Sequence, residues 1–353
     1  MPEKSEAAFR HSSAKYMVAI FLLLSVLLLA LFFLDIFFGT VRISPGEVLN
    51  AVFSQASDTT EQIIMKFRIP KAITAVLVGI SLSVCGLQMQ TLFRNPMAGP
   101  YVLGISSGAS LGVALVVLGF SSSIMTDFMQ SAGNWILVIS AWTGSGIIML
   151  LIFFIASKVR DIMTILIIGI MLASGISAVV TILQYFSNET MLKAYVVWTM
   201  GSLGNLSGNQ LKVLGISVAV GLALSIFTIK MLNALLLGET YAGSLGLNIR
   251  RSRVLIFICT SILAGSVTAF CGPIGFIGIA VPHIVRNIFR TSDHKILLPA
   301  SVLAGGAIML LSDILTLVPG SDSVLPINSV TSLIGIPVVI WVIMRNRRTT
   351  GVF

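Results

Sequence analysis

Two stretches decide the fold of this chain: RNPMAGP at residues 94–100 and GPIGFIG at residues 272–278. Each interrupts an otherwise hydrophobic run with Gly and Pro, which break helices. Backbone groups freed in this way are tolerated at membrane depth only against protein or beside a water-filled cavity. The two stretches are therefore predicted to line a pathway through a membrane, or to form joints beside one.

The composition around these stretches is that of a membrane protein. Of 353 residues, 56% are hydrophobic and 10% are charged, against roughly 25% charged in a typical soluble domain. The first apolar run, residues 17–34, carries no charge, and its length is close to the about 20 residues that a helix needs to cross a bilayer. It is too long for a signal-peptide core and no small-residue cleavage site follows it, so we expect a retained helix.

Nine further apolar runs of similar character follow. They cover residues 72–91, 101–120, 135–156, 164–186, 211–229, 254–270, 275–289, 297–317 and 327–344. The predicted fold class is all-α, a polytopic membrane protein with about ten transmembrane helices. No stretch has the composition of a soluble domain, so residues 1–353 are predicted to form a single transmembrane domain.

The basic residues predict the orientation of these spans. With both termini in the cytoplasm, 16 of the 22 Lys and Arg residues face inward, and the remaining six face outward: Arg42, Lys66, Arg68, Lys71, Lys193 and Lys212. Such an excess on the cytoplasmic side is what the positive-inside rule requires. The net charge of +9 thus reflects membrane topology, and no nucleic-acid partner is needed to explain it.

The longest inward loop, residues 230–253, has apolar residues at helical spacing and is punctuated by Gly238 and Gly246. This pattern predicts two short helices at the cytoplasmic surface. Such a pair could be an interfacial anchor or a docking site for a partner. The periodicity leaves both interpretations open.

Glycines at positions 104, 108 and 112 recur every four residues in the third span, with Ser106 and Ser107 beside them. This spacing forms a glycine face that lets another helix approach closely. The alternative is that Gly104, Ser106, Ser107 and Gly108 form a smooth wall of a pathway beside the break at residues 94–100.

Several kinds of chemistry are missing. The chain has no Gly-Lys dipeptide, hence no phosphate-binding loop, and is predicted not to hydrolyse ATP by itself. Asp35 and Asp313 are expected near the outer ends of their spans, whereas an ion-coupled carrier needs acidic residues at the midplane. Neither catalytic motifs nor a metal-ligand spacing of His or Cys is found, so no enzyme and no metal site is predicted.

Read together, many motifs resemble the FecCD-type permeases of ABC importers for iron-siderophore complexes, haem and cobalamin. The matching segments are Arg68-Ile69-Pro70-Lys71, Gly79, Gly86, Gln90 and residues 94–112, 196–205, 235–247, 272–286, 292–306 and 325–338. The resemblance covers almost the whole chain in order, and motifs at so many consistent spacings are highly specific.

The resemblance implies a homodimer of ten-helix subunits in the bacterial cytoplasmic (inner) membrane, with a translocation path along the dimer axis. Two ATPase subunits would bind ATP and Mg on the cytoplasmic side, and a substrate-binding protein would dock outside. This chain itself would hold no cofactor. Its cargo would be an iron complex with a siderophore or haem; a cobalamin importer is the alternative, and an ion-coupled secondary carrier a more distant one.

The resemblance also assigns residues. Asn95 and Met97 would belong to the cytoplasmic gate, and Ile162 and Met163 would form a further constriction. An ordinary Asn-Pro turn is the alternative for Asn95.

Gly238, Glu239 and Gly246 would belong to the element that couples the permease to the ATPase. Arg68 and Lys71 would lie on the outer surface and pair with carboxylates of the binding protein, or simply anchor the chain beside the membrane. One departure from the family pattern affects this interface: Leu317 stands where an Arg is common, and residues 324–328 differ from the usual segment.

Overall fold

The computed structural model describes residues 2–39, 41, 43–44, 46–48, 58–119, 134–159, 161–318 and 323–349. Within these ranges, only the backbone is described for residues 2–14, 157, 342–343 and 345–349. Arg42 and Arg160, which the charge count used, lie outside the described residues.

Among the described residues, the regular elements are all helices, and the only β pairing is one isolated antiparallel bridge between Leu317 and Val324. The long helices are α1 (Pro2–Phe37), α4 (Ile69–Leu92), α7 (Trp135–Lys158), α8 (Ile162–Phe186), α10 (Gly208–Leu235), α12 (Ile249–Cys271), α14 (His294–Ile314) and α15 (Ile327–Thr349). The shorter elements are α3 (Asp58–Ile63), the π-helix η1 (Ile64–Arg68), the 3-10 helix η2 (Pro100–Leu103), α5 (Ile105–Val117), α9 (Glu189–Thr199), α11 (Glu239–Ser244) and α13 (Ile277–Phe289).

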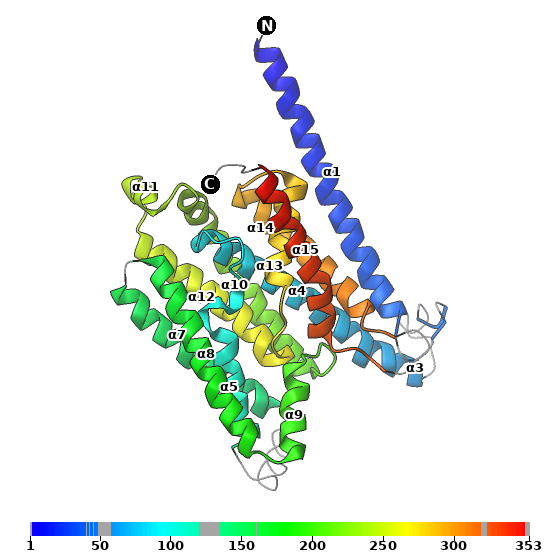
Figure 1. The fold of residues 1–353 in the computed structure, drawn as a ribbon. Helices are drawn as coiled ribbons and strands as arrows, with labels where there is room; N and C mark the ends of the chain where they lie inside the picture. Colours follow the sequence, from blue (N-terminus) through cyan, green and yellow to red (C-terminus); the bar gives the residue numbers. More distant parts are fainter. Residues whose placement is uncertain are drawn as a thin grey trace.

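The helices confirm the predicted fold class. Seven of the described helices are long and apolar enough to cross a membrane, and three shorter apolar helices lie at residues 105–117, 277–289 and 327–341. Helix α1 begins, and helix α15 ends, at the end of the molecule where α11 lies, whereas α9 lies at the opposite end (Figure 1). We call these the α11 end and the α9 end.

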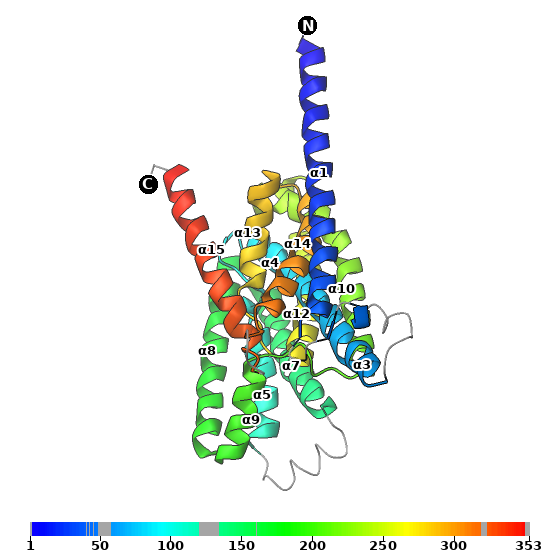
Figure 2. The ribbon, with the colours of Figure 1, turned by 90° about the vertical axis from the view of Figure 1, so that its right-hand side faces the viewer.

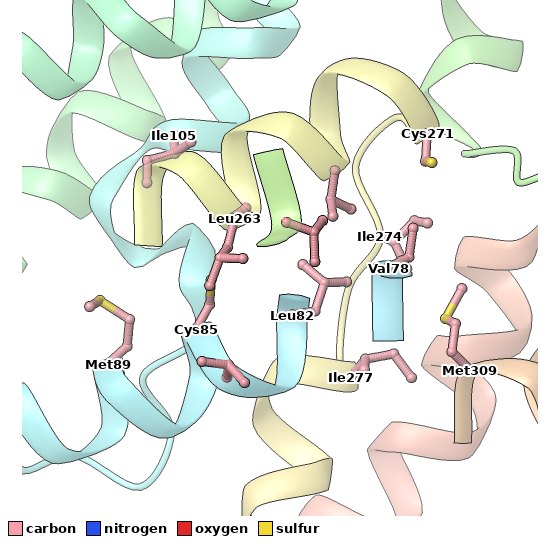
Figure 3. Packing of buried hydrophobic residues seen from close by; sticks show 14 of the residues in the cluster. Val78, Leu82, Cys85, Met89, Ile105, Leu263, Cys271, Ile274, Ile277 and Met309 are labelled. Atoms are coloured by element: carbon pink, nitrogen blue, oxygen red, sulfur yellow. The ribbon is translucent and has the colours of Figure 1, made fainter. Parts of the chain in front are cut away.

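Helix α4 is the centre of the fold and is buried along most of its length. It packs against α10, α12, α13 and α14, and Figure 3 shows its Val78 beside Ile274 and its Cys85 beside Leu263 of α12. Gly86 allows the closest of these contacts: a Cβ atom there would lie 1.6 Å from the carbonyl oxygen of Gly278. Only glycine fits at this crossing of α4 and α13.

The two stretches that break the hydrophobic pattern precede the two short helices inside the bundle. Residues 94–100 lead through η2 into α5, and residues 272–276 lead into α13. Each of these helices has 13 residues. At 1.5 Å per residue its length is about 20 Å, which is shorter than the hydrocarbon core of a bilayer at about 30 Å. The third predicted span is thus wrong in detail, because its first four residues belong to η2 and its N-cap glycine.

The outer helices differ in what they leave uncovered. Helix α1 packs on α14, and its other faces expose large apolar side chains such as Leu22 and Val26. On the other side of the bundle, α8 exposes Ile170 and Met171 (Figure 2). These surfaces are suited to lipid or to another apolar protein surface.

The loop at residues 230–253 differs from the predicted pair of helices. Residues 232–235 continue α10, only α11 is a separate short helix, and α12 begins at Ile249. The apolar spacing before Gly238 was correctly helical, but it extends a long helix because no breaker precedes Gly238.

Candidate transport and docking sites

The turn at residues 94–100 lies at the α11 end and has a defined shape. Arg94 has a positive φ of 47°, a conformation that costs energy for a residue with a Cβ atom. The Asn95 side chain accepts a hydrogen bond from the Met97 amide at 2.9 Å. The Asn-Pro turn predicted as the alternative for Asn95 is therefore present, and it does not exclude a role in a gate.

Helix α13 holds this turn in place. The Nε2 atom of His283 lies 2.8 Å from the Pro96 carbonyl oxygen. The Gln90 amide donates to the Ile279 carbonyl oxygen at 3.1 Å, and Arg286 donates to the Gln90 side-chain oxygen. Sequence analysis assigned no role to His283 and Arg286, because nothing in the pattern showed that they face α4 and the turn.

The four predicted gate residues are not equivalent. Met97 and Met163 are 40% and 39% exposed, and Asn95 is half-buried, so these three can meet another subunit. Ile162 is only 8% exposed and packs inside the subunit. In this structure the first turn of α8 directs the Ile162 side chain into the core, and a constriction at Ile162 and Met163 stays a prediction.

The glycine face of α5 packs against α7. A Cβ atom at Gly108 would lie 2.6 Å from the Gly144 carbonyl oxygen, and one at Gly112 would lie 2.0 Å from the Ser140 carbonyl oxygen. The helix-packing interpretation is confirmed at these two positions, so Gly108 is not a free pathway wall.

The remaining residues assigned to the wall lie at the start of α5. Gly104 is its N-cap residue, with a φ of 74°. Ser106 is buried and Ser107 half-buried. A pathway role for Gly104, Ser106 and Ser107 stays a prediction.

Helix α11 is fixed by an ion pair. Gly238 precedes it with a φ of 100°, and Gly246 follows it with a φ of 86°. The Glu239 carboxylate accepts from the Arg253 guanidinium, with a Nε–Oε1 distance of 3.0 Å. Glu239 therefore holds α11 against α12, and its carboxylate is already used within the chain.

Helix α11 and the residues that flank it expose large apolar side chains, beside the exposed polar Thr240 and Ser244. Tyr241 is 54% exposed and Leu245 is 62% exposed, and Leu237 just before the helix is 60% exposed. A Cβ atom at Gly238 would lie 3.5 Å from Nη1 of Arg94. The predicted coupling element and the predicted gate turn are thus direct neighbours at the α11 end.

A polar cluster joins three helix ends beside this surface. His294 contacts the Thr91 hydroxyl at 2.8 Å and the Asn233 side-chain oxygen at 2.7 Å. The Asn233 amide donates to Asp293 at 2.6 Å. The pKa of Asp293 is lowered, mainly by the hydrogen bond from the Lys295 amide and further by the one from Asn233. The ends of α4 and α10 are therefore fixed to the start of α14.

The α9 end contains a cavity of about 800 Å³. Its walls are largely apolar and include Phe67, Trp198 and Phe270, and its charged lining residues are Asp35, Arg68, Lys71 and Asp313. A mostly apolar cavity with a few converging polar groups is the usual form of a binding site. The sequence placed Asp35 and Asp313 near this end but gave no sign that they meet.

Arg68 is not the surface cation that the sequence predicted. It is 8% exposed, and its guanidinium donates to the carbonyl oxygens of Ile36 at 2.8 Å, of Phe37 at 3.0 Å and of Val41. The first two carbonyls belong to the last turn of α1 and the third follows the helix, where backbone acceptors lack helical partners. Arg68 therefore caps α1 from within the chain.

Lys71 also has an internal partner: its Nζ atom lies 2.9 Å from Oδ1 of Asp313. Its side chain is 28% exposed, so a contact with another protein would have to compete with this ion pair. Leu317, which replaces the family Arg, is half-buried, lines the same cavity and pairs with Val324.

No group of three or more His, Cys, Asp or Glu side chains that could hold a metal ion occurs in the described part of the chain. The three cysteines, Cys85, Cys259 and Cys271, are free and buried.

These features define a polytopic helical membrane protein with a broken, braced turn beside a short exposed helix at one end. Residues 27–345 match the model of the FecCD transport family, and the chain belongs to this family. It is accordingly a permease of the ABC-importer type.

Two similar proteins cover most of the chain. The hemin transport system permease of Yersinia pestis is 34% identical over 83% of this chain and 86% of its own. The vitamin B12 import system permease of Citrobacter koseri is 34% identical over 92% of this chain and 94% of its own. Each match covers more than four fifths of both chains.

Solved structures agree with this assignment. A metal-chelate type ABC transporter in an inward-facing conformation has a TM-score of 0.80 at 28% identity, covering 93% of this chain and 99% of that one. PsaBC from Streptococcus pneumoniae has a TM-score of 0.51 at 16% identity, covering 85% and 95%, and shows similarity of fold alone.

Proposed function

We propose that this chain is the permease subunit of an ATP-driven importer that takes an iron complex, with a siderophore or haem, from a binding protein into the cytoplasm. It acts as a homodimer, and residues 1–353 serve as one transmembrane domain. Two separate ATPase subunits bind ATP and Mg, so the chain itself needs no cofactor. It resides in a bacterial inner membrane with both termini in the cytoplasm.

One observation carries this proposal. The turn at residues 94–100 and helix α11 are neighbours, joined through Arg94 and Gly238. An ATPase that binds the exposed Tyr241 and Leu245 would therefore press on an element directly beside Asn95 and Met97. His283 contacts the same turn from α13, and Arg286 ties α13 to Gln90 of α4, so a displacement would reach the bundle interior.

The relatives support the cargo class without choosing within it. One relative is described as transporting hemin and the other as importing vitamin B12, at equal identity. An iron complex is our first candidate and cobalamin the second. Binding of each ligand to the partner binding protein would decide between them.

The first test is reconstitution in lipid vesicles. The chain alone should hydrolyse no ATP, because it contains no phosphate-binding loop. With an ATPase subunit and a binding protein, uptake should depend on ATP and persist when ion gradients are collapsed. Uptake that stops with the ion gradient while ATP remains would favour the secondary carrier.

The second test addresses the dimer and the gate. Asn95→Cys and Met97→Cys should cross-link between subunits in the resting state and block uptake, because two-fold symmetry brings equal positions together at the axis. Tyr16→Cys is the matched control, since Tyr16 is also exposed but belongs to α1, across the bundle from α8. Cross-linking of the control alone, in intact dimers, would contradict this gate.

A further inference from the structure

The cavity at the α9 end brings together two carboxyl groups that are far apart in sequence. Asp35 comes from the last turn of α1 and Asp313 from the last turn of α14, and both side chains are buried. Both residues line the same cavity, and α1 packs on α14. Two like charges that face one buried cavity repel each other in a medium of low dielectric constant.

The neighbouring cations do not supply enough hydrogen-bond donors. Arg68 gives its hydrogen bonds to backbone carbonyls at the end of α1. Lys71 is the ion-pair partner of Asp313 Oδ1. Within the described residues, no group donates a hydrogen bond to Asp313 Oδ2, although Asp313 is only 2% exposed. A buried carboxylate oxygen without a donor is costly.

A proton between the two groups would remove this cost. Two ionised carboxylates are acceptors only, whereas a protonated carboxyl group donates one O–H bond. We propose that Asp35 and Asp313 form a proton-binding site, in which one proton is shared between the two carboxyl groups and joins α1 to α14.

The surroundings of the pair are consistent with a single bound proton. The charged groups among the described lining residues are Arg68 from η1 and Lys71 from α4, besides the pair itself. The lining residues from α9, α12 and residues 324–327 carry no charge. With Arg68 bound to carbonyl oxygens, Lys71 balances one carboxylate and the proton neutralises the other.

Infrared spectroscopy of the purified full chain in lipid nanodiscs tests this site, because a carboxylic acid and a carboxylate absorb at different frequencies. A carboxylic acid band that shifts in D2O should be present at neutral pH and be lost in Asp35→Asn. The amide introduced by this substitution can donate to Asp313 Oδ2, so Asp313 can remain ionised beside Lys71. Absence of the band at every pH between about 5 and 9 would overturn the proposal.

Two further variants separate the pair from other acidic groups. Lys71→Met removes the cation that favours an ionised Asp313, so the band should be retained, and to a higher pH than in the unaltered protein. Asp161→Asn is the control: Asp161 is an exposed N-cap at the α11 end, where hydrogen bonds from Thr164 lower its pKa. A band that survives Asp35→Asn, or disappears in Asp161→Asn, would overturn the assignment.

Sodium provides the last comparison, because a small cation could occupy the same position between two carboxylates. Replacing sodium by tetramethylammonium at constant pH should leave the band unchanged. If sodium displaces the band in the unaltered protein, the pair binds an alkali ion and the proton assignment is wrong.

Discussion

The two basic residues predicted to dock a partner at the α9 end differ from the exposed arginines at the α11 end. At the α9 end, Arg68 is buried against backbone carbonyls and Lys71 is paired with Asp313. At the α11 end, Arg94, Arg250 and Arg251 are exposed. Arg253 and Arg286 at the α11 end also bond within the chain, and Lys66 beside Arg68 is exposed, so each end contains both kinds of basic residue. The two cations predicted to dock a binding protein are both of the bonded kind.

This difference changes what a charge substitution measures. At the α9 end a reversal such as Arg68→Glu would place a buried carboxylate among carbonyl oxygens, so a loss of docking there could simply reflect a loss of folding. At the α11 end, substitutions of exposed side chains can report on partner binding itself.

The largest expected effect tests the burial of Arg68. Arg68→Met should lower the free energy of unfolding by about 3 kcal/mol, because hydrogen bonds to a charged group contribute about 1.5 to 3 kcal/mol each. Lys66→Met is the matched control, since Lys66 belongs to the same π-helix but is exposed. Unfolding of the purified chain by SDS in mixed micelles measures both; equal stability of the two variants would remove the contrast between bonded and exposed basic residues.

The next effect concerns the ion pair of Lys71. Lys71→Met leaves Asp313 without its cation and should cost about 2 kcal/mol, less than a fully buried pair because Lys71 is partly exposed. The double variant Lys71→Met with Asp313→Leu should recover most of this loss, since neither charge then remains unpaired. The same unfolding assay applies, and a double variant less stable than Lys71→Met would argue against the pair.

A third prediction uses the exposed surface of α11. Tyr241→Ala should weaken binding of the ATPase subunit about tenfold, or about 1.4 kcal/mol, with the stability of the isolated chain unchanged. Ile226→Ala is the control, because Ile226 is similarly exposed but lies in the middle of α10. Binding is measured by titration in nanodiscs; loss of stability in Tyr241→Ala would assign the residue to the fold.

The smallest effect concerns the position that departs from the family. Leu317 lines the cavity that contains Asp35 and Asp313, so an Arg there has carboxyl partners inside the chain. Leu317→Arg should change association of the binding protein by less than about 1 kcal/mol, with its salt dependence nearly unchanged. A sharp rise in association rate at low salt would show that the new Arg faces the partner.

The sequence predicted the spans well for a physical reason. Backbone groups in a bilayer must be satisfied within helices, so apolar runs such as residues 164–186 and 254–270 correspond closely to α8 and α12. The break at residues 94–100 was predicted for the same reason, because Pro and Gly cannot continue a helix there.

What the sequence did not show depends on contacts between distant segments. The acceptors that bind Arg68 are backbone carbonyls of residues 36, 37 and 41, and every residue type has such a carbonyl. The burial of Ile162 depends on the direction of the first turn of α8, and the meeting of Asp35 with Asp313 depends on how α1 packs on α14. Composition and spacing contain none of this information.

The crossing of Gly86 and Gly278 limits how this molecule can move. The backbones touch there without side chains between them, and His283, Arg286 and Gln90 add further ties between α13, α4 and the turn. We expect these parts to move together, so that a displacement of the turn beside α11 is passed on to α13. The backbone that leads into α13 is itself held, because the Ser202 amide donates to the Cys271 carbonyl oxygen at 2.9 Å and the Gly275 amide donates to Oδ1 of Asn328 at 3.0 Å.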